Sequence, residues 1–154
     1  EEKGLLGSRY YTDNPIYPLE STVANLNIDM IGRLDDWHYN GNYVYLIGSD
    51  RLSYDLHDLN EKINDEYIGI DLDYRFNDKD DPNRYYYRSD HYNFAKNNIP
   101  VIFYFNGVHE DYHKPSDTIE KLDFDKINTI TKLIFLTAWE IANRDDRIKL
   151  RDDL

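Results

Sequence analysis

The chain has no cysteine. Disulfide bonds and thiolate-bound metals are therefore excluded, while the compartment in which the protein works is left open. Any zinc ion would have to be held by histidine, aspartate or glutamate side chains. Such a ligand set is more typical of catalytic zinc sites than of structural ones.

Positive charge and long apolar segments are also scarce. The 18 lysine and arginine residues stand against 30 aspartates and glutamates, which gives a formal net charge of −12. This balance argues against a nucleic-acid partner and against anionic membrane surfaces, because both need a basic face. No apolar run approaches the length of about 20 residues that spans a membrane, and no signal peptide is visible.

The composition nevertheless provides for a folded core. Hydrophobic residues make up 40% of the 154 residues and aromatic residues 15%, including 15 tyrosines. The length suits a single domain, and the apolar content argues against disorder. Tyrosine combines an apolar ring with a polar hydroxyl, which suits half-buried surfaces and the walls of pockets.

The spacing of apolar residues predicts strands that alternate with helices. Helices are predicted over residues 4–12, 53–64, 90–97 and 123–143, and strands over residues 23–30, 43–47, 68–74 and 100–105. The polar segment 77–83 is predicted to be a loop, and the charged tail 144–154 is expected to fray. Alternating strands and helices indicate one three-layer α/β domain over residues 1–154.

Three carboxylates suit metal ligation or general-base catalysis. Glu1 and Glu2 open the chain, and at a turn from a strand into a helix both could face a cleft. One would then bind a metal while the other accepts a proton; the alternative is an acidic first turn that stabilises a helix. Asp29 lies among apolar residues, where a buried carboxylate is costly unless it is paired or binds metal. The alternative for Asp29 is a strand-end residue that caps a turn.

One histidine suits the same chemistry. His113 lies in a polar segment that Pro115 stiffens. A neutral imidazole on a stiff loop is a good zinc ligand when its other ring nitrogen has a hydrogen-bond partner. The alternative is an ordinary surface histidine.

Four segments of the chain, taken together, resemble peptidase family M28, a family of zinc aminopeptidases. These segments are, in chain order, EEKGLLGS, ANLNIDMIGR, SDHYNFAKNNIPVIFYF and HEDYHKPSDT. The resemblance runs from Glu1 to about Arg144 and covers only the C-terminal part of the family's catalytic domain. It implies a three-layer α/β/α fold of the zinc-peptidase and phosphorylase/hydrolase kind, with a mixed, mostly parallel sheet that is truncated on its N-terminal side.

The resemblance also implies roles for single residues. Glu1 matches the general base, Glu2 a ligand of one zinc, and Asp29 and His113 ligands of the other. Just before the pocket segment Ser89, Asp90 and His91, either Tyr86 or Tyr87 matches a tyrosine that hydrogen-bonds the oxyanion in some members.

Two ligands of the family's two-zinc site are missing from this chain. The family takes a histidine, from a His-x-Asp motif, and a bridging aspartate from sequence before the Glu-Glu pair. His109 and Asp111 have the His-x-Asp form but lie in the wrong place, so we interpret them as a coincidence. His38 and His57 have no counterpart and are interpreted as surface residues. We therefore expect an incomplete zinc site, with weak zinc binding and little hydrolysis by this piece alone.

The function that the resemblance implies is that of a metallo-aminopeptidase, a hydrolase that removes N-terminal residues from peptides with a free N-terminus. One alternative is a glutaminyl cyclase-type zinc acyltransferase, and another is a non-catalytic peptidase-like interaction domain. The resemblance also favours a secreted or periplasmic protein. A truncated sheet would leave an exposed edge, through which the chain could associate with itself.

Overall fold

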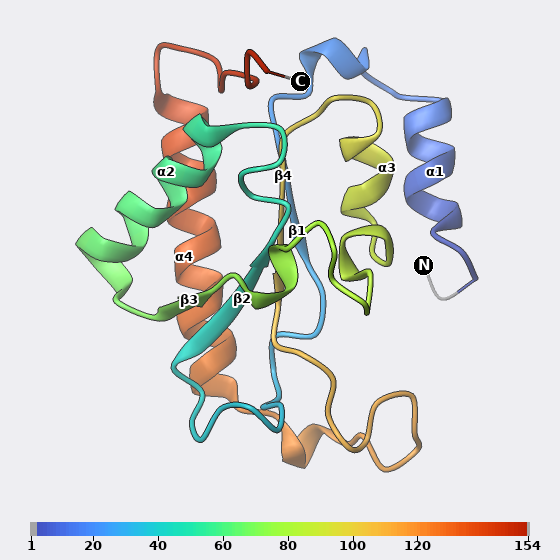
Figure 1. The fold of residues 1–154 in the computed structure, drawn as a ribbon, viewed down its shortest axis with the longest axis vertical. Helices are drawn as coiled ribbons and strands as arrows, with labels where there is room; N and C mark the ends of the chain where they lie inside the picture. Colours follow the sequence, from blue (N-terminus) through green and yellow to red (C-terminus); the bar gives the residue numbers. More distant parts are fainter. Residues whose placement is uncertain (1–2, 154) are drawn as a thin grey trace.

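The computed structural model describes residues 3–153, which form a four-stranded sheet with helices on both faces (Figure 1). The helices are α1 (Leu6–Asp13), α2 (Tyr54–Ile63), α3 (His91–Ala95) and α4 (Phe124–Asn143). The strands are β1 (Asn25–Ile28), β2 (Tyr43–Ile47), β3 (Asp71–Asp73) and β4 (Val101–Phe105). Their order in the sheet is β1-β4-β2-β3.

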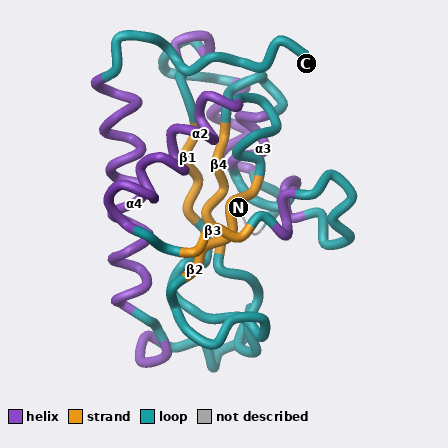
Figure 2. The backbone as a smooth tube through the Cα atoms, turned by 60° about the vertical axis from the view of Figure 1, so that its left-hand side comes forward, coloured by secondary structure: helices purple, strands orange, loops and turns teal. Residues whose placement is uncertain are grey.

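The sheet is mixed, as the sequence predicted. β1 runs parallel to β4 and β2 runs parallel to β3, whereas β2 and β4 are antiparallel. In Figure 1, α2 and α4 lie on the left of the sheet and α1 and α3 on its right, and Figure 2 shows the same separation of α4 from α3 across the strands. The three-layer α/β fold class is therefore confirmed.

The two central strands are buried on both faces. Every residue of β2 and of β4 is buried, which explains why both segments are continuous apolar runs rather than alternating ones. On one face of the sheet Val44, Leu46 and Ile102 pack against α2 and α4. On the other face Phe103 and Phe105 join a second core that includes Ala95 of α3.

The long helix α4 follows its sequence pattern closely. Ile130, Leu133 and Ile134 are buried, at the three- and four-residue spacing that places side chains on one helical face. Asp123 caps the first turn, because its side chain accepts a hydrogen bond of 2.9 Å from the backbone N–H of Lys126.

The strand predicted over residues 68–74 is shorter in the structure. The chain continues from α2 through a π-helical turn, Asn64–Ile68, and β3 begins only at Asp71. The buried side chain of Asn64 holds this turn, since it donates to the carbonyl of Ile70 at 2.9 Å and accepts from its N–H at 3.1 Å. A local side-chain hydrogen bond thus replaces the expected first strand residues.

The C-terminal tail differs from the frayed segment expected from its charge. Ile148 is buried in the core beside α2. The hydroxyl of Ser53 donates to the carbonyl of Lys149 at 2.6 Å, and the N–H of Lys149 donates to Asp55 at 3.0 Å. These contacts hold the tail against the start of α2.

No helix among residues 3–153 is both long enough and apolar enough to cross a membrane.

Truncation of Leu133 to alanine should destabilise the fold. This side chain is fully buried in the core between α4 and the sheet, so Leu133→Ala removes apolar contacts and leaves a cavity that costs about 2–5 kcal/mol. Lys132→Ala on the same helix is the matched control, because the exposed Lys132 should cost less than about 0.5 kcal/mol. Urea unfolding followed by circular dichroism measures both values. Equal costs would contradict the packing of α4 described above.

Candidate functional site

A cavity of about 600 Å³ lies on the α1–α3 side of the sheet, at the ends of β1 and β4. Its walls come from five parts of the chain: the start of α1, the end of β1, the turn before α3 together with α3, the end of β4 and the loop around His113. Four residues singled out from the sequence line it, namely Asp29, Tyr87, Ser89 and His113. Residues far apart in sequence thus share one concave surface, as in most ligand sites.

Asp29 follows the last residue of β1 and is half-buried. Asn27 donates from its side-chain nitrogen to the Ser89 hydroxyl at 2.9 Å, and that hydroxyl donates to Oδ2 of Asp29 at 2.9 Å. The other carboxylate oxygen of Asp29 has no hydrogen-bond partner within the described part of the chain. One oxygen is therefore oriented by the protein, and the other is available to a ligand.

The position of Asp29 corrects one expectation. The sequence placed it inside a strand over residues 23–30, whereas β1 ends at Ile28 and forms one edge of the described sheet. A strand end at a cavity tolerates a carboxylate that a central strand would not, because water and Ser89 solvate it.

His113 is exposed, lines the same cavity and stacks on Tyr112, with ring centroids 3.8 Å apart. Its backbone φ of 56° lies in the left-handed region, which residues other than glycine adopt rarely. Such strain is held by the surrounding structure, and it occurs preferentially at functional sites.

An ion-pair network holds the loop that carries His113. Asp111 is buried and lies 2.6 Å from a guanidinium nitrogen of Arg33 and 2.8 Å from the ammonium of Lys121. Arg33 also pairs with Asp117, so it ties both sides of the loop together. Hydrogen bonds from Arg33 and Lys121 hold the pKa of the Asp111 carboxyl well below its usual range.

The structure distinguishes the two candidate tyrosines. Tyr87 is 38% exposed and lines the cavity. Tyr86 is buried beneath Gly48, where an added side-chain carbon would lie 2.7 Å from its ring, and the Arg51 guanidinium covers the ring at 3.9 Å. Burial raises the pKa of Tyr86. Of the pair, Tyr87 is the residue whose hydroxyl can reach a molecule in the cavity.

Asp90 and His91 do not line the cavity but contact residues next to it. Asp90 accepts a hydrogen bond from Ser8 of α1, and Asn93 of α3 donates to the same Ser8 hydroxyl at 2.7 Å, so the two helices are joined by buried polar contacts. His91 is fully buried and stacks on Phe103, whose ring lines the cavity, with centroids 4.7 Å apart. Burial lowers the pKa of His91 to about 3, which keeps the imidazole neutral.

Glu1 and Glu2, the expected base and ligand, lie outside the described residues. Gly4 and Leu5, which follow them closely, line the cavity. The carbonyl of Leu5 accepts a hydrogen bond of 3.2 Å from the Asn93 side chain, so the chain leading into α1 is anchored at this wall.

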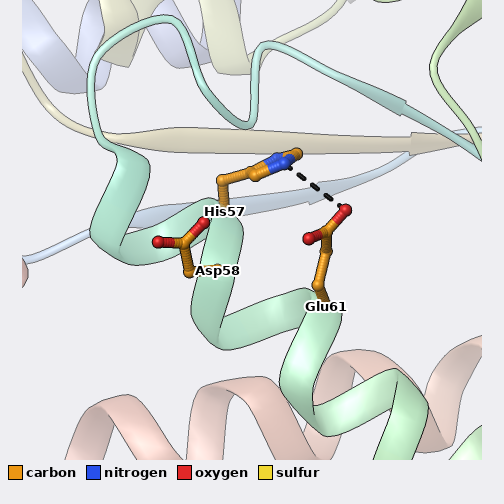
Figure 3. Close-up of side chains that lie close together, drawn as sticks. All are labelled: His57, Asp58 and Glu61. Atoms are coloured by element: carbon orange, nitrogen blue, oxygen red, sulfur yellow. Dashed lines mark ion pairs between the residues drawn. The ribbon is translucent and has the colours of Figure 1, made fainter.

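Two other groups of metal-ligating side chains occur in the described chain, and neither is an open site. On α2, ligand atoms of His57, Asp58 and Glu61 lie within 4.8 Å of one another (Figure 3). The His57 ring nitrogens lie 2.9 Å from the Ser49 hydroxyl and 3.5 Å from Glu61, which also accepts a hydrogen bond of 2.9 Å from Tyr74. His57 and Glu61 therefore already have protein partners.

The second group consists of His109, Asp111 and Asp117. Here Arg33 and Lys121 already neutralise the carboxylates, and their positive charges would repel a metal ion. This network gives a physical reason for setting aside the His-x-Asp form of His109 and Asp111.

The interpretation of His38 and His57 as surface residues was wrong. The side chain of His38 is 15% exposed, lies 2.9 Å from Asp35 and stacks on Tyr43 at 3.5 Å. The side chain of His57 is 19% exposed and has the partners described above. Both histidines belong to half-buried polar networks that join near neighbours in sequence to more distant residues, Asp73 beside His38 and Tyr74 beside Glu61, and this packing is not visible in a single sequence.

Two residues that support the site, Asn27 and Arg33, were not predicted from the sequence. Asn27 orients Ser89, and its position two residues before Asp29 on a strand was a usable signal, since residues i and i+2 share a face. The pairing of Arg33 with Asp111 had no local signal.

The donors at the cavity fit a zinc ion. A carboxylate oxygen of Asp29 and the imidazole of His113 are zinc-ligand types on the walls of one cavity. The Ser89 hydroxyl orients Asp29, which is the kind of support that ligating carboxylates have in zinc proteins. The third expected ligand, Glu2, is one of the residues that the structure does not describe.

Three solved aminopeptidase structures are similar to this chain in fold. The LapA aminopeptidase of Legionella pneumophila has a TM-score of 0.71 and 25% identity, covering 94% of this chain and 38% of LapA. An aminopeptidase from Aneurinibacillus sp. strain AM-1 has a TM-score of 0.68 and 21% identity, covering 97% of this chain and 33% of that enzyme. The zinc aminopeptidase BSAP from Bacillus subtilis has a TM-score of 0.68 and 22% identity, covering 97% and 36%.

The chain therefore spans between 33% and 38% of the length of these enzymes. A search of curated proteins gave no match. The sequence model of peptidase family M28 matches residues 1–138, which is most of the chain. By this match, the chain belongs to peptidase family M28.

Proposed function

We propose that this chain forms part of the active site of a zinc-dependent aminopeptidase, which hydrolyses N-terminal residues from peptides that carry a free N-terminus. The observation that carries the proposal is the meeting of Asp29 and His113 on the walls of one cavity. They come from distant parts of a chain that belongs to a peptidase family. The aminopeptidase structures of the same fold support the choice of substrate.

In this proposal Asp29 and His113 hold one zinc ion, and Glu2 contributes to a second. Zinc, when bound, acts as a Lewis acid that polarises the scissile carbonyl and lowers the pKa of water. The hydroxyl of Ser89 keeps the Asp29 carboxylate in one orientation, and the stack on Tyr112 restrains the His113 ring. Glu1 serves as the general base that accepts the proton of the attacking water.

Tyr87 completes the proposed chemistry. The residue lines the cavity, and in this proposal its hydroxyl donates a hydrogen bond to the oxygen that becomes negative in the transition state. Phe103 and Phe105 line the same cavity and exclude water from part of it, which strengthens such a hydrogen bond. An apolar first side chain of the peptide could pack on these rings.

Three features of the whole protein rest on this proposal. The two missing ligands, a histidine and a bridging aspartate, would come from elsewhere in a longer protein, so the present chain alone should bind zinc weakly and turn over little substrate. Export to the periplasm or the exterior rests on the family resemblance. Self-association would use the free edge of β1, where Ile28 is 49% exposed.

Replacement of His113 should weaken zinc binding. His113→Ala removes an imidazole ligand, so we expect the zinc affinity of the chain to fall by at least about tenfold. His57→Ala is the matched control, because His57 also lies beside carboxylates but away from the cavity. Isothermal titration with zinc chloride measures both affinities. If the control loses zinc and His113→Ala keeps it, the metal site lies on α2 instead.

Substitution of the two neighbouring tyrosines should have different effects on kcat of the full-length protein, measured with leucine anilide as the substrate. Tyr87→Phe removes the proposed oxyanion donor and should lower kcat by about 10²-fold with little change in KM. Tyr86→Phe removes a buried hydroxyl that does not border the cavity and should leave kcat nearly unchanged.

Glu1→Gln removes the proposed general base, so it should abolish hydrolysis of leucine anilide. This variant is the reference for complete loss of activity. Equal rates for the two tyrosine variants would remove Tyr87 from the mechanism. Full activity of Glu1→Gln would remove the proposed function as stated. Formation of pyroglutamate from a glutaminyl peptide, without hydrolysis of the anilide, would indicate a glutaminyl cyclase instead.

A further inference from the structure

The charged residues that line the cavity are mostly cationic, whereas the chain as a whole has a net negative charge. The whole sequence has 30 acidic and 18 basic residues. Among the described residues that line the cavity, however, three are cationic, namely Arg9, Arg88 and Lys96, and only Asp29 is anionic. A concave wall of one charge sign concentrates ligands of the opposite sign.

The three cations have no carboxylate partner among the residues that the structure describes. No carboxylate of residues 3–153 lies within 4 Å of Arg9, Arg88 or Lys96. By contrast, Arg33 and Arg144 pair with carboxylates at 2.6 and 3.0 Å. Within residues 3–153, three cations around one cavity therefore remain available to an external anion.

Each of the three cations is held at the cavity by a different piece of backbone. Arg9 lies on α1, Arg88 just before α3, and Lys96 just after it. The two helices are fastened together through the hydrogen bond between Ser8 and Asp90. Arg88 is also restrained, since its guanidinium lies 5.0 Å from the centre of the Tyr85 ring, which lines the cavity as well.

We infer that this cavity selects short peptides that present a carboxylate to Arg9, Arg88 and Lys96, while their N-terminal residue lies towards Asp29 and His113. Arginine and lysine form charge-assisted hydrogen bonds with carboxylates, which are stronger than neutral ones. A volume of about 600 Å³ is within the range of small-ligand sites and suits a peptide of a few residues. The inference rests on the proposed function and names its substrate class.

The carboxylate of the peptide could be its C-terminus or an acidic side chain, and pairs of matched peptides distinguish the two. Leucyl-alanine against leucyl-alaninamide tests the C-terminal carboxylate. Leucyl-glutamic acid α-amide against leucyl-glutaminamide tests an acidic side chain at the second residue. With the full-length, zinc-loaded protein, we expect kcat/KM to be at least about tenfold higher for the carboxylate member of one pair. The ratio should fall as salt is raised, because exposed charges are screened.

Variants connect this preference to the cavity. The double variant Arg88→Gln and Lys96→Gln should bring the ratio of the carboxylate peptide to its amide close to one. Lys132→Gln is the matched control, because Lys132 is an exposed cation on α4 across the sheet, and it should keep the ratio of the unaltered protein. A ratio near one in the unaltered protein for both pairs would overturn the inference, as would a ratio that the double variant leaves unchanged.

A binding measurement separates this inference from the proposed function. Isothermal titration of the Glu1→Gln protein with the same four peptides reports affinity without turnover. Hydrolysis without any preference for a carboxylate peptide would support the proposed aminopeptidase function and overturn the inference about the substrate class. A second outcome is tighter binding of a carboxylate peptide, lost in the double variant, with no hydrolysis by the unaltered protein. That outcome would support the inference about the cavity and overturn the proposed aminopeptidase function.

Discussion

The parallel pairing of β1 with β4 is the constraint on which the site depends. Ile28 is in register with Tyr104, and the N–H of Asp29 donates to the carbonyl of Tyr104 at 3.3 Å. Because both strands run in the same direction, their C-terminal ends meet at one edge of the sheet. Asp29 follows one end, and the loop that carries His113 follows the other. Two distant segments are thereby brought to the same cavity.

Buried polar contacts then give this cavity its shape. Ser8, Asp90 and Asn93 fasten α1 to α3, and Arg33 with Asp111 fastens the loop of His113. Both segments also pack apolar side chains into the second core, Ala95 from α3 and Val108 from the loop, and the hydrogen bonds and ion pairs fix their orientation over it. A removed partner at either place would leave a buried polar group behind, which is costly.

The cavity also concentrates a charge that the rest of the chain does not have. The chain as a whole carries a net charge of −12, whereas Arg9 and Lys96, which line the cavity, have no carboxylate partner among residues 3–153. The same cavity is lined by Asp29 and His113, whose side chains are of the types that bind a cation. In our proposal a cavity with both kinds of group suits a zwitterionic ligand, which carries an amine and a carboxylate.

Much of the fold was predictable because its signals are local. The strand over residues 43–47 and the helix over residues 123–143 were predicted within a residue of their bounds, since an apolar run or a helical stripe is visible in a few turns of chain. The strand over residues 68–74 was predicted too long, because the side chain of Asn64 extends the preceding helix through hydrogen bonds to Ile70. The tail was expected to fray because its contacts with Ser53 and Asp55 join positions far apart in sequence.

The sequence by itself determined the family, the layered α/β fold and the residue types that suit zinc, because motif order and apolar spacing are properties of the linear chain. Only the tertiary structure decided that Tyr87 rather than Tyr86 borders the cavity, that Ser89 orients Asp29, and that cations without a carboxylate partner among residues 3–153 line the cavity. These decisions depend on which distant backbone segments lie next to one another. Strand pairing and helix docking determine which segments become neighbours, and the linear sequence pattern does not contain this information.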